Sequence, residues 1–199
     1  MSKVVHIFVE GDADVKFISD YISHIKLAEA KIHGLNGWTD IKNMRTDIAR
    51  YKDENNDVLV IFDADTSKNK GGFVTRKKQI EDYALPLDDI FLFPDNQNDG
   101  ALEDLLENII NNKNKPIFDC WERYETCLKE CASKKIGKEL TTPAKKSKIY
   151  GYLEVLVGET EKEKKKIKDP NRDYKKEEHW NLDAKYLNPL KEFLLKYLN

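Results

Sequence analysis

An apolar run that ends in two acids constrains this chain more than any other feature. Residues 57–67 read DVLVIFDADTS, so five apolar residues come directly before Asp63 and Asp65. Uninterrupted apolar runs rich in β-branched residues are typical of parallel strands that are buried on both faces. Side chains alternate along a strand, so we expect Asp63 and Asp65 to lie on the same side of it. The sequence therefore predicts a central strand that delivers two carboxylates at its carboxyl end.

These paired acids allow two interpretations. Neighbouring carboxylates repel each other unless a cation or a proton lies between them, and α/β sheets bind ligands at the carboxyl ends of their strands. A divalent metal site at the end of this strand is the first interpretation. In the second, Asp65, Thr66 and Ser67 cap the next element and Asp63 is a surface turn residue.

A similar strand followed by acids opens the chain. Residues 4–9 form an apolar run that is broken only by His6, and Glu10, Gly11 and Asp14 follow it. The next residues place apolar side chains at helical spacing, so Asp14 falls in the first turn of a helix, close enough to share a site with Glu10. The alternative is that Asp14 only complements the helix dipole, which is the role we assign to its neighbour Asp12.

Two further strands complete the expected sheet. Residues 30–35 form a weaker strand candidate, and residues 89–93 form a fourth strand that leads into a polar loop. Glu103 lies just past this loop, at the start of a short helix, as an additional ligand candidate or a dipole partner. Strand–helix units of roughly 30 residues predict a parallel sheet of about four strands with right-handed crossovers. A helix over residues 73–83 is expected to turn Phe73, Ile80 and Tyr83 inward and Arg76, Lys77 and Lys78 outward.

The second half of the chain is expected to be helical. We predict an α/β core over residues 1–110 and a helical extension over residues 111–199 that packs on it. Residues 1–110 carry a net charge of −8 and residues 111–179 a net charge of +5. This asymmetry fits an acidic, metal-carrying core beside a basic, phosphate-contacting surface, and it equally fits a solvated helical tail. The almost wholly charged residues 159–178 are predicted to form a mobile loop.

Cysteine usage and hydropathy indicate the setting of the protein. The three cysteines are Cys120, Cys127 and Cys131, an odd count without framework spacing, which favours a reducing, cytoplasmic location. No zinc site is expected, because neither a fourth cysteine nor a cluster of histidines accompanies them. No apolar run approaches the ~20 residues of a membrane span, and the first residues lack a signal-peptide layout, so no membrane partner is expected.

Together these motifs resemble a TOPRIM domain, the Rossmann-like catalytic module of topoisomerases, primases and OLD-family nucleases. The resemblance rests on Val9-Glu10-Gly11 with Asp14 after the first strand, and on Asp63-Ala64-Asp65 after the third. Residues 93–106, and more loosely residues 179–182 and 189–194, resemble the stand-alone bacterial group DUF3226, which is related to the OLD type.

The resemblance implies a fold, a site and a partner. It implies a Rossmann-like sheet flanked by helices, with divalent metal bound by five acids: Glu10, Asp14, Asp63, Asp65 and Glu103. It also implies an assisting lysine from the C-terminal part, for which we choose Lys146, with Lys145 and Lys148 as alternatives. OLD proteins carry an ATPase in the same chain, and this sequence has no Walker A motif, so any ATPase partner would be encoded separately.

Ligands that are all oxygen suit Mg²⁺ or Mn²⁺. The leading hypothesis is therefore metal-dependent hydrolysis or transfer of a phosphodiester in DNA or RNA. Glu10 would act as a general acid or base, and Lys146 would offset charge that builds on the phosphate. Two alternatives stay open: a non-catalytic module that binds nucleic acid or protein, and a phosphatase for small phosphate substrates.

Overall fold

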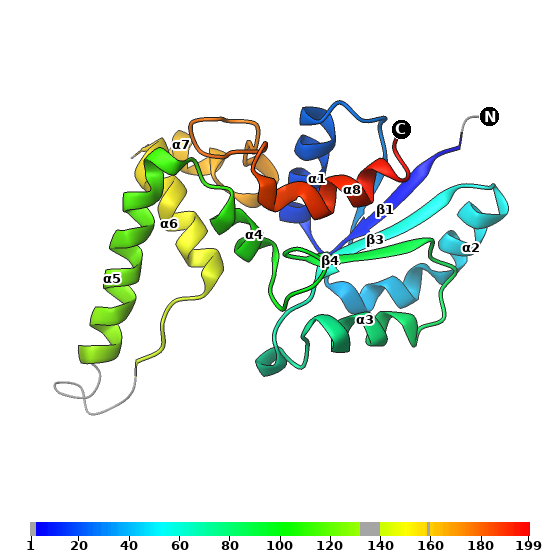
Figure 1. Ribbon diagram of the computed structural model, residues 1–199, viewed down its shortest axis with the longest axis horizontal. Helices are drawn as coiled ribbons and strands as arrows, with labels where there is room; N and C mark the ends of the chain where they lie inside the picture. Colours follow the sequence, from blue (N-terminus) through cyan, green and yellow to red (C-terminus); the bar gives the residue numbers. More distant parts are fainter. Residues whose placement is uncertain (1–2, 132–139, 159) are drawn as a thin grey trace.

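The computed structural model describes residues 3–131, 140–158 and 160–199 of the chain. Its centre is a four-stranded parallel sheet in the order β2-β1-β3-β4 (Figure 1). The strands are β1 (Val5–Val9), β2 (Lys31–Gly34), β3 (Asp57–Asp63) and β4 (Asp89–Phe93). The predicted fold class is confirmed, and β3 lies inside the sheet with β1 beside it, as expected.

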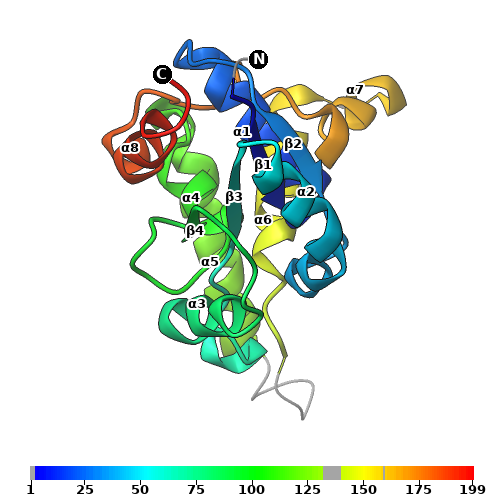
Figure 2. The same ribbon diagram turned by 90° about the vertical axis from the view of Figure 1, so that its right-hand side faces the viewer.

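Helices cover both faces of this sheet. α1 (Asp12–His24) and α8 (Asn188–Leu195) lie on one face, and α2 (Arg45–Asp53) and α3 (Phe73–Glu81) lie on the other (Figures 1 and 2). Side chains alternate along β3 and pack against the helices on both faces of the sheet. Leu59 and Ile61 pack toward α1, whereas Val58 and Val60 pack toward α2. Burial on both faces explains why this strand reads as an unbroken apolar run.

The strand order fixes where a ligand can bind. From β1 the chain moves to β2 on one side and later to β3 on the other, so the connections diverge between β1 and β3. Such a switch point leaves a crevice at the carboxyl ends of the two strands, and open α/β sheets bind their ligands there. Glu10 follows β1 and Asp63 ends β3, so both acids stand at this crevice.

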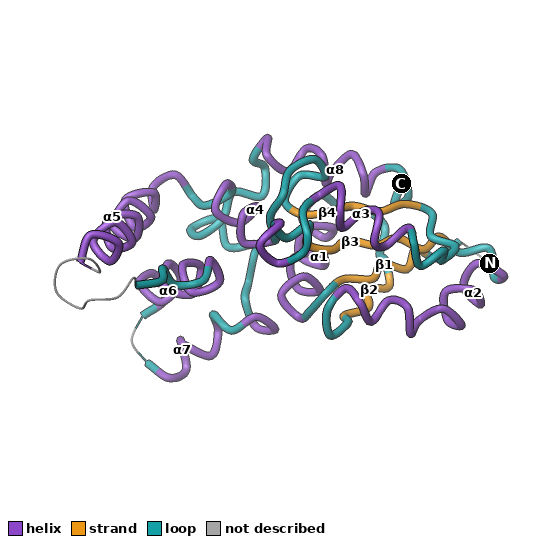
Figure 3. The backbone as a smooth tube through the Cα atoms, turned by 90° about the horizontal axis from the view of Figure 1, so that it is seen from below, coloured by secondary structure: helices purple, strands orange, loops and turns teal. Residues whose placement is uncertain are grey.

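The second half of the chain adds four more helices before α8 among the described residues. They are α4 (Leu102–Asn108), α5 (Lys115–Cys131), α6 (Lys145–Val157) and α7 (Glu161–Lys166). α5 and α6 lie side by side and extend away from the sheet (Figures 1 and 3). None of the helices in residues 3–131, 140–158 and 160–199 combines the length and the apolar character needed to cross a membrane.

The charged segment before α8 is folded, so the prediction of a mobile loop over residues 159–178 is wrong. Beyond Glu159, which lies outside the described residues, the segment forms α7 and a short 3₁₀ helix (Asp169–Asn171). Tyr174 is fully buried, and its backbone N–H donates to Asp20 Oδ2 at 2.9 Å. Arg172 is buried as well and donates to the carbonyl of Ile167 and to Tyr174 Oη. A few buried contacts thus hold the segment against α1, although its residues are mostly charged.

Candidate metal and phosphate site

The centre of the site is formed where β1 and β3 end. These strands pair in parallel, with Val9 opposite Ile61, so the residues that follow them emerge together. The backbone N–H of Asp63 donates to Glu10 Oε1 at 2.9 Å, which joins the two strand ends directly. Gly11 then opens α1, whose first turn carries Asp14.

Asp14 and Glu10 hold their protons unusually strongly. Asp14 is buried, and this burial, followed by the charges of Glu10 and Glu103, raises its pKa to about 7. Burial also raises the pKa of Glu10 to about 7, with a further contribution from Asp65, although the N–H of Asp63 and the charge of Arg76 oppose the shift. Both acids therefore titrate near neutral pH in the ion-free protein.

Asp63 connects Glu10 and Asp14 to α4. Its Oδ1 accepts a hydrogen bond from the backbone N–H of Leu102 at 2.8 Å, at the start of α4, where Glu103 follows. Burial raises the pKa of Asp63 well above its usual range, and Asp14, Glu10 and Glu103 each raise it further. Four of the five predicted ligands, at the end of β1, in α1, at the end of β3 and in α4, therefore lie within electrostatic reach of one another.

Asp65 occupies a different environment from Asp63. The strand ends at Asp63, and Asp65 has a left-handed backbone with φ of 60°, so strand alternation does not position its side chain. Asp65 Oδ2 forms an ion pair with Arg76 Nη2 at 2.5 Å. The expectation that Arg76 points outward is wrong, since this residue is only 2% exposed. Arg76 follows Phe73 by three residues and precedes Ile80 by four. This helical spacing is the sequence signal from which its inward position could have been predicted.

The three lysines proposed for the site stand at the start of α6, each beside an acid. Lys145 pairs with Asp104, Lys148 with Glu107 at 2.9 Å, and Lys146 with Asp169 at 2.6 Å. The pKa of Lys146 is raised, first by its hydrogen bond to Asp169 and, to a smaller extent, by the charge of Glu103. Lys146 therefore lies within electrostatic reach of Glu103, and its ion-pair partner Asp169 is a residue that the sequence did not reveal.

The donors fit a divalent cation. Glu10, Asp14, Asp63 and Glu103 offer only carboxylate oxygens, and none of the described basic side chains forms an ion pair with them. A cation between them would offset both the burial and the neighbouring charges that raise the pKa values of Glu10, Asp14 and Asp63. As the side chains stand, no three or more His, Cys, Asp or Glu residues in the described ranges are arranged to hold a metal ion.

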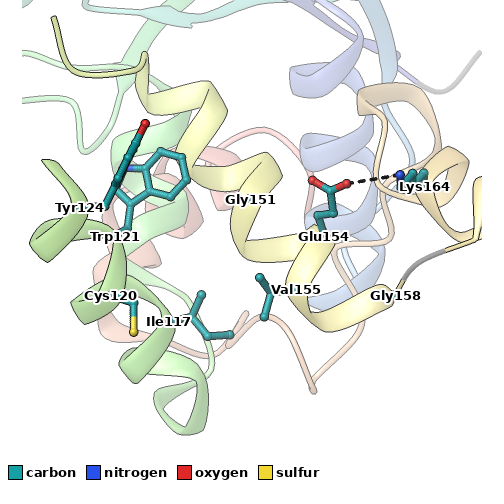
Figure 4. A pocket seen from close by; sticks show the side chains of 9 residues that line it. All are labelled: Ile117, Cys120, Trp121, Tyr124, Gly151, Glu154, Val155, Gly158 and Lys164. Carbon is teal, nitrogen blue, oxygen red and sulfur yellow. Dashed lines mark ion pairs between the residues drawn. The ribbon is translucent and has the colours of Figure 1, made fainter. Parts of the chain in front are cut away.

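A large pocket lies elsewhere in the molecule. It has a volume of about 680 Å³ and opens between α5 and α6, where Trp121, Tyr124, Ile117 and Val155 line it (Figure 4). Its lining is mainly apolar, and Glu154 and Lys164 form a loose ion pair of 3.8 Å at its edge. None of the predicted ligands lines this pocket, so it is separate from the carboxylate site.

The fold and the site together define a class. The chain is a three-layer α/β protein with a parallel sheet, and buried Asp14 and half-buried Glu10 and Asp63 lie at the switch point of that sheet. Within this class, the family model described as "Protein of unknown function (DUF3226)" matches residues 4–199, and the chain belongs to this family. Comparisons with the curated proteins and with the solved structures found no match.

Proposed function

We propose that this protein is a Mg²⁺- or Mn²⁺-dependent enzyme that hydrolyses or transfers phosphodiesters of DNA or RNA. One observation carries the proposal: Glu10, Asp14 and Asp63 lie at the switch point with Glu103 beside them, and burial together with neighbouring carboxylates raises the pKa values of Glu10, Asp14 and Asp63. Partly buried carboxylates that lie close together are unfavourable for folding alone, and groups with such perturbed pKa values are enriched at functional centres. The five-acid pattern with Asp65, similar to that of OLD-type TOPRIM domains, supports the same assignment.

Each residue would have a distinct role. Glu10, Asp14, Asp63, Asp65 and Glu103 would hold the cation, which supplies an activated water and charge stabilisation for a phosphodiester when it is bound. With a pKa of about 7, Glu10 can take or give a proton near neutral pH, as a general acid or base must. Lys146 would face the phosphate from the start of α6 and offset its developing charge.

The proposal extends to partners. The basic residues of the second half would guide the phosphate backbone toward an acidic site that would otherwise repel it. By the OLD-type resemblance, a separately encoded ATPase would act with this chain. Two other functions remain as competitors: a binding module without catalysis, and a phosphatase for small substrates.

A cleavage assay tests the proposal directly. The protein would be incubated in Mg²⁺, in Mn²⁺ or in EDTA with supercoiled DNA, single-stranded DNA, RNA, the diester bis-p-nitrophenyl phosphate or the monoester p-nitrophenyl phosphate. Binding of the nucleic acids would be measured under the same conditions. We expect cleavage of at least one nucleic acid that depends on the cation and that Asp14→Asn lowers at least a hundredfold. Asp12→Asn is the matched control, because Asp12 is an exposed acid in the same helical turn and should retain activity.

The competing functions give different results in the same assay. Binding of nucleic acid without cleavage under any cation condition would identify a binding module and overturn the enzymatic proposal. Hydrolysis that is restricted to p-nitrophenyl phosphate, a monoester, would instead assign the site to small phosphate substrates.

A further inference from the structure

Arg76 is held on three sides beside the carboxylate site. Its Nη2 lies 2.5 Å from Asp65 Oδ2, and its Nη1 donates to Gln79 Oε1 at 3.0 Å. The guanidinium carbon lies 4.0 Å from the centre of the Trp38 ring, a cation–π contact. Arg76 is only 2% exposed and has little freedom to move. Its guanidinium therefore fixes the position of the Asp65 oxygen that it binds.

Asp65 is fixed through its backbone as well. Its N–H donates to the carbonyl of Gly100 at 2.7 Å, and the N–H of Gly100 donates back at 2.8 Å. Gly71 closes the loop over it so tightly that a Cβ there would lie 2.5 Å from Asp65 Cβ. The side chain of Asp65 is nevertheless 28% exposed. One of its oxygens is thus bound to Arg76, while Oδ1 has no hydrogen-bond partner among the described residues.

The same loop that stacks on Arg76 also reaches Glu10. Trp38 follows Gly37, whose backbone N–H donates to the carbonyl of Glu10 at 3.1 Å. Arg76 and Asp65 both alter the pKa of Glu10, in opposite directions, so both charges lie within electrostatic reach of the site. Arg76 therefore belongs to the surroundings of the carboxylates and not to the outer surface of α3.

We propose that Arg76 is the positioning residue of Asp65: by holding Oδ2 it directs Oδ1 toward the cation that Glu10, Asp14 and Asp63 would bind. The inference rests on the proposed function, because it needs a cation at this site. Arginine suits the task better than lysine, since its planar fork can bind Asp65 and Gln79 at once while it stacks on Trp38. Groups that orient a metal ligand typically change metal affinity by about 10- to 100-fold when they are mutated.

Arg76→Lys tests this inference, because it keeps the charge and removes the fork. We expect the Mn²⁺ affinity measured by calorimetry to fall about 10- to 100-fold. In an Asp65→Asn background the same change should alter the remaining affinity less than about twofold, since the held group is already altered. Arg45→Lys is the matched control: Arg45 donates to the carbonyls of Tyr83 and Ala84, just beyond the opposite end of α3, and its loss should leave Mn²⁺ binding unchanged.

A second variant covers the case in which Arg76→Lys does not fold. Gln79→Ala removes one anchor of the guanidinium at a partly exposed position, and it should weaken Mn²⁺ binding about two- to fivefold. Unchanged or tighter Mn²⁺ binding in both variants would overturn the inference, and tighter binding would show that Arg76 competes with the cation for Asp65.

The calorimetric result also separates this inference from the proposed function. A protein that binds Mn²⁺ in an Arg76-dependent way but cleaves no phosphodiester would overturn the function and leave the positioning role intact. A wild-type protein that binds no Mn²⁺ would overturn both.

Discussion

At the residue scale, the two acids of the Asp63-Ala64-Asp65 motif have neighbours of opposite charge. Asp63 stands among other carboxylates, and its pKa is raised by burial and by Asp14, Glu10 and Glu103. Asp65 stands beside the buried guanidinium of Arg76. The first acid therefore destabilises the ion-free protein when it is charged, whereas the second satisfies a charge that would otherwise be buried alone.

This difference predicts opposite effects of two conservative substitutions. Asp63→Asn should leave the free energy of unfolding in EDTA unchanged or raise it by about 1 kcal/mol, because it removes repulsion and keeps an oxygen for the N–H of Leu102. Asp65→Asn should lower it by about 1–3 kcal/mol, because Arg76 loses its counter-charge. Both should weaken Mn²⁺ binding. Urea unfolding and calorimetry measure the two effects, and equal stability losses would contradict the assignment.

The raised pKa values also predict how stability depends on pH. Folded Glu10 and Asp14 have pKa values of about 7, well above the ordinary values of about 4, so they favour the folded state at low pH. That contribution should be lost as the pH rises from about 4 through about 7. In EDTA, Asp14→Asn should therefore gain stability relative to wild type between pH 5 and pH 8, by at least about 1 kcal/mol. Thermal unfolding at several pH values checks this, and saturating Mn²⁺ should reduce the difference.

Lys146 leads to a kinetic prediction. If its charge acts on the transition state, Lys146→Ala should lower kcat at least about tenfold and change substrate affinity less than about twofold. Lys145→Ala is the matched control. Lys145 precedes Lys146 by one residue in α6, but it pairs with Asp104 of α4. Steady-state kinetics on the best nucleic-acid substrate would measure both variants, and equal losses would remove the distinction between the two lysines.

At the element scale, the apolar patterns predicted the sheet and its flanking helices well. The runs before Glu10 and Asp63 mark β1 and β3 unambiguously, because central parallel strands bury both faces. Arg76 differs from its predicted orientation, because its helical spacing with Phe73 and Ile80 places it on the inner face of α3 although it is charged. The segment around Tyr174 is ordered although its composition predicts a loop, because buried Tyr174 and Arg172 and the bond to Asp20 hold it against α1.

The candidate site was predictable only in part. Strand ends reveal Glu10 and Asp63, since parallel strands finish at the same edge of a sheet. The partner of Lys146 could not be found this way, because Asp169 lies 23 residues further along the chain in a segment that looks disordered by composition. Distances between such segments follow from packing, which short-range patterns do not encode.

α7 provides a test at the scale of one element. It carries exposed lysines at positions 162, 165 and 166, and Lys168 follows it. If this surface binds phosphates, replacing these four lysines with glutamine should reduce the salt slope of DNA and RNA binding by about 0.7–0.9 for each phosphate that is no longer neutralised. Lys77→Gln with Lys78→Gln on α3 is the control. An unchanged slope in a fluorescence-anisotropy salt titration would mean that α7 does not bind the backbone.

At the scale of the whole molecule, the two halves of the chain share one core. Phe193 of α8 packs against Phe91 of β4 with ring centres 5.4 Å apart, and the backbone N–H of Ala28 donates to the carbonyl of Leu198 at 3.1 Å. Side chains from α1, α4, α6 and α8 belong to the same buried cluster as β1 and β3. One face of the sheet is therefore covered in part by residues from the last helix of the sequence.

This shared core predicts that α8 is essential for stability. Phe193→Ala should lower the free energy of unfolding by about 3–5 kcal/mol, the usual cost of removing a buried aromatic side chain. Val74→Ala, at a position that is 77% exposed, should change it by less than about 0.5 kcal/mol. Urea unfolding of both variants measures the difference, and a small effect of Phe193→Ala would mean that α8 is dispensable for the core.

The position of α8 has a consequence for biosynthesis. Translation produces β1 early, yet the helix that completes the covering of its sheet face comes from residues 188–195. A nascent chain on the ribosome therefore carries an incompletely covered apolar surface for most of its synthesis, and that surface is open to association with other chains. We therefore expect chaperone binding to the nascent chain to be strongest just before α8 emerges.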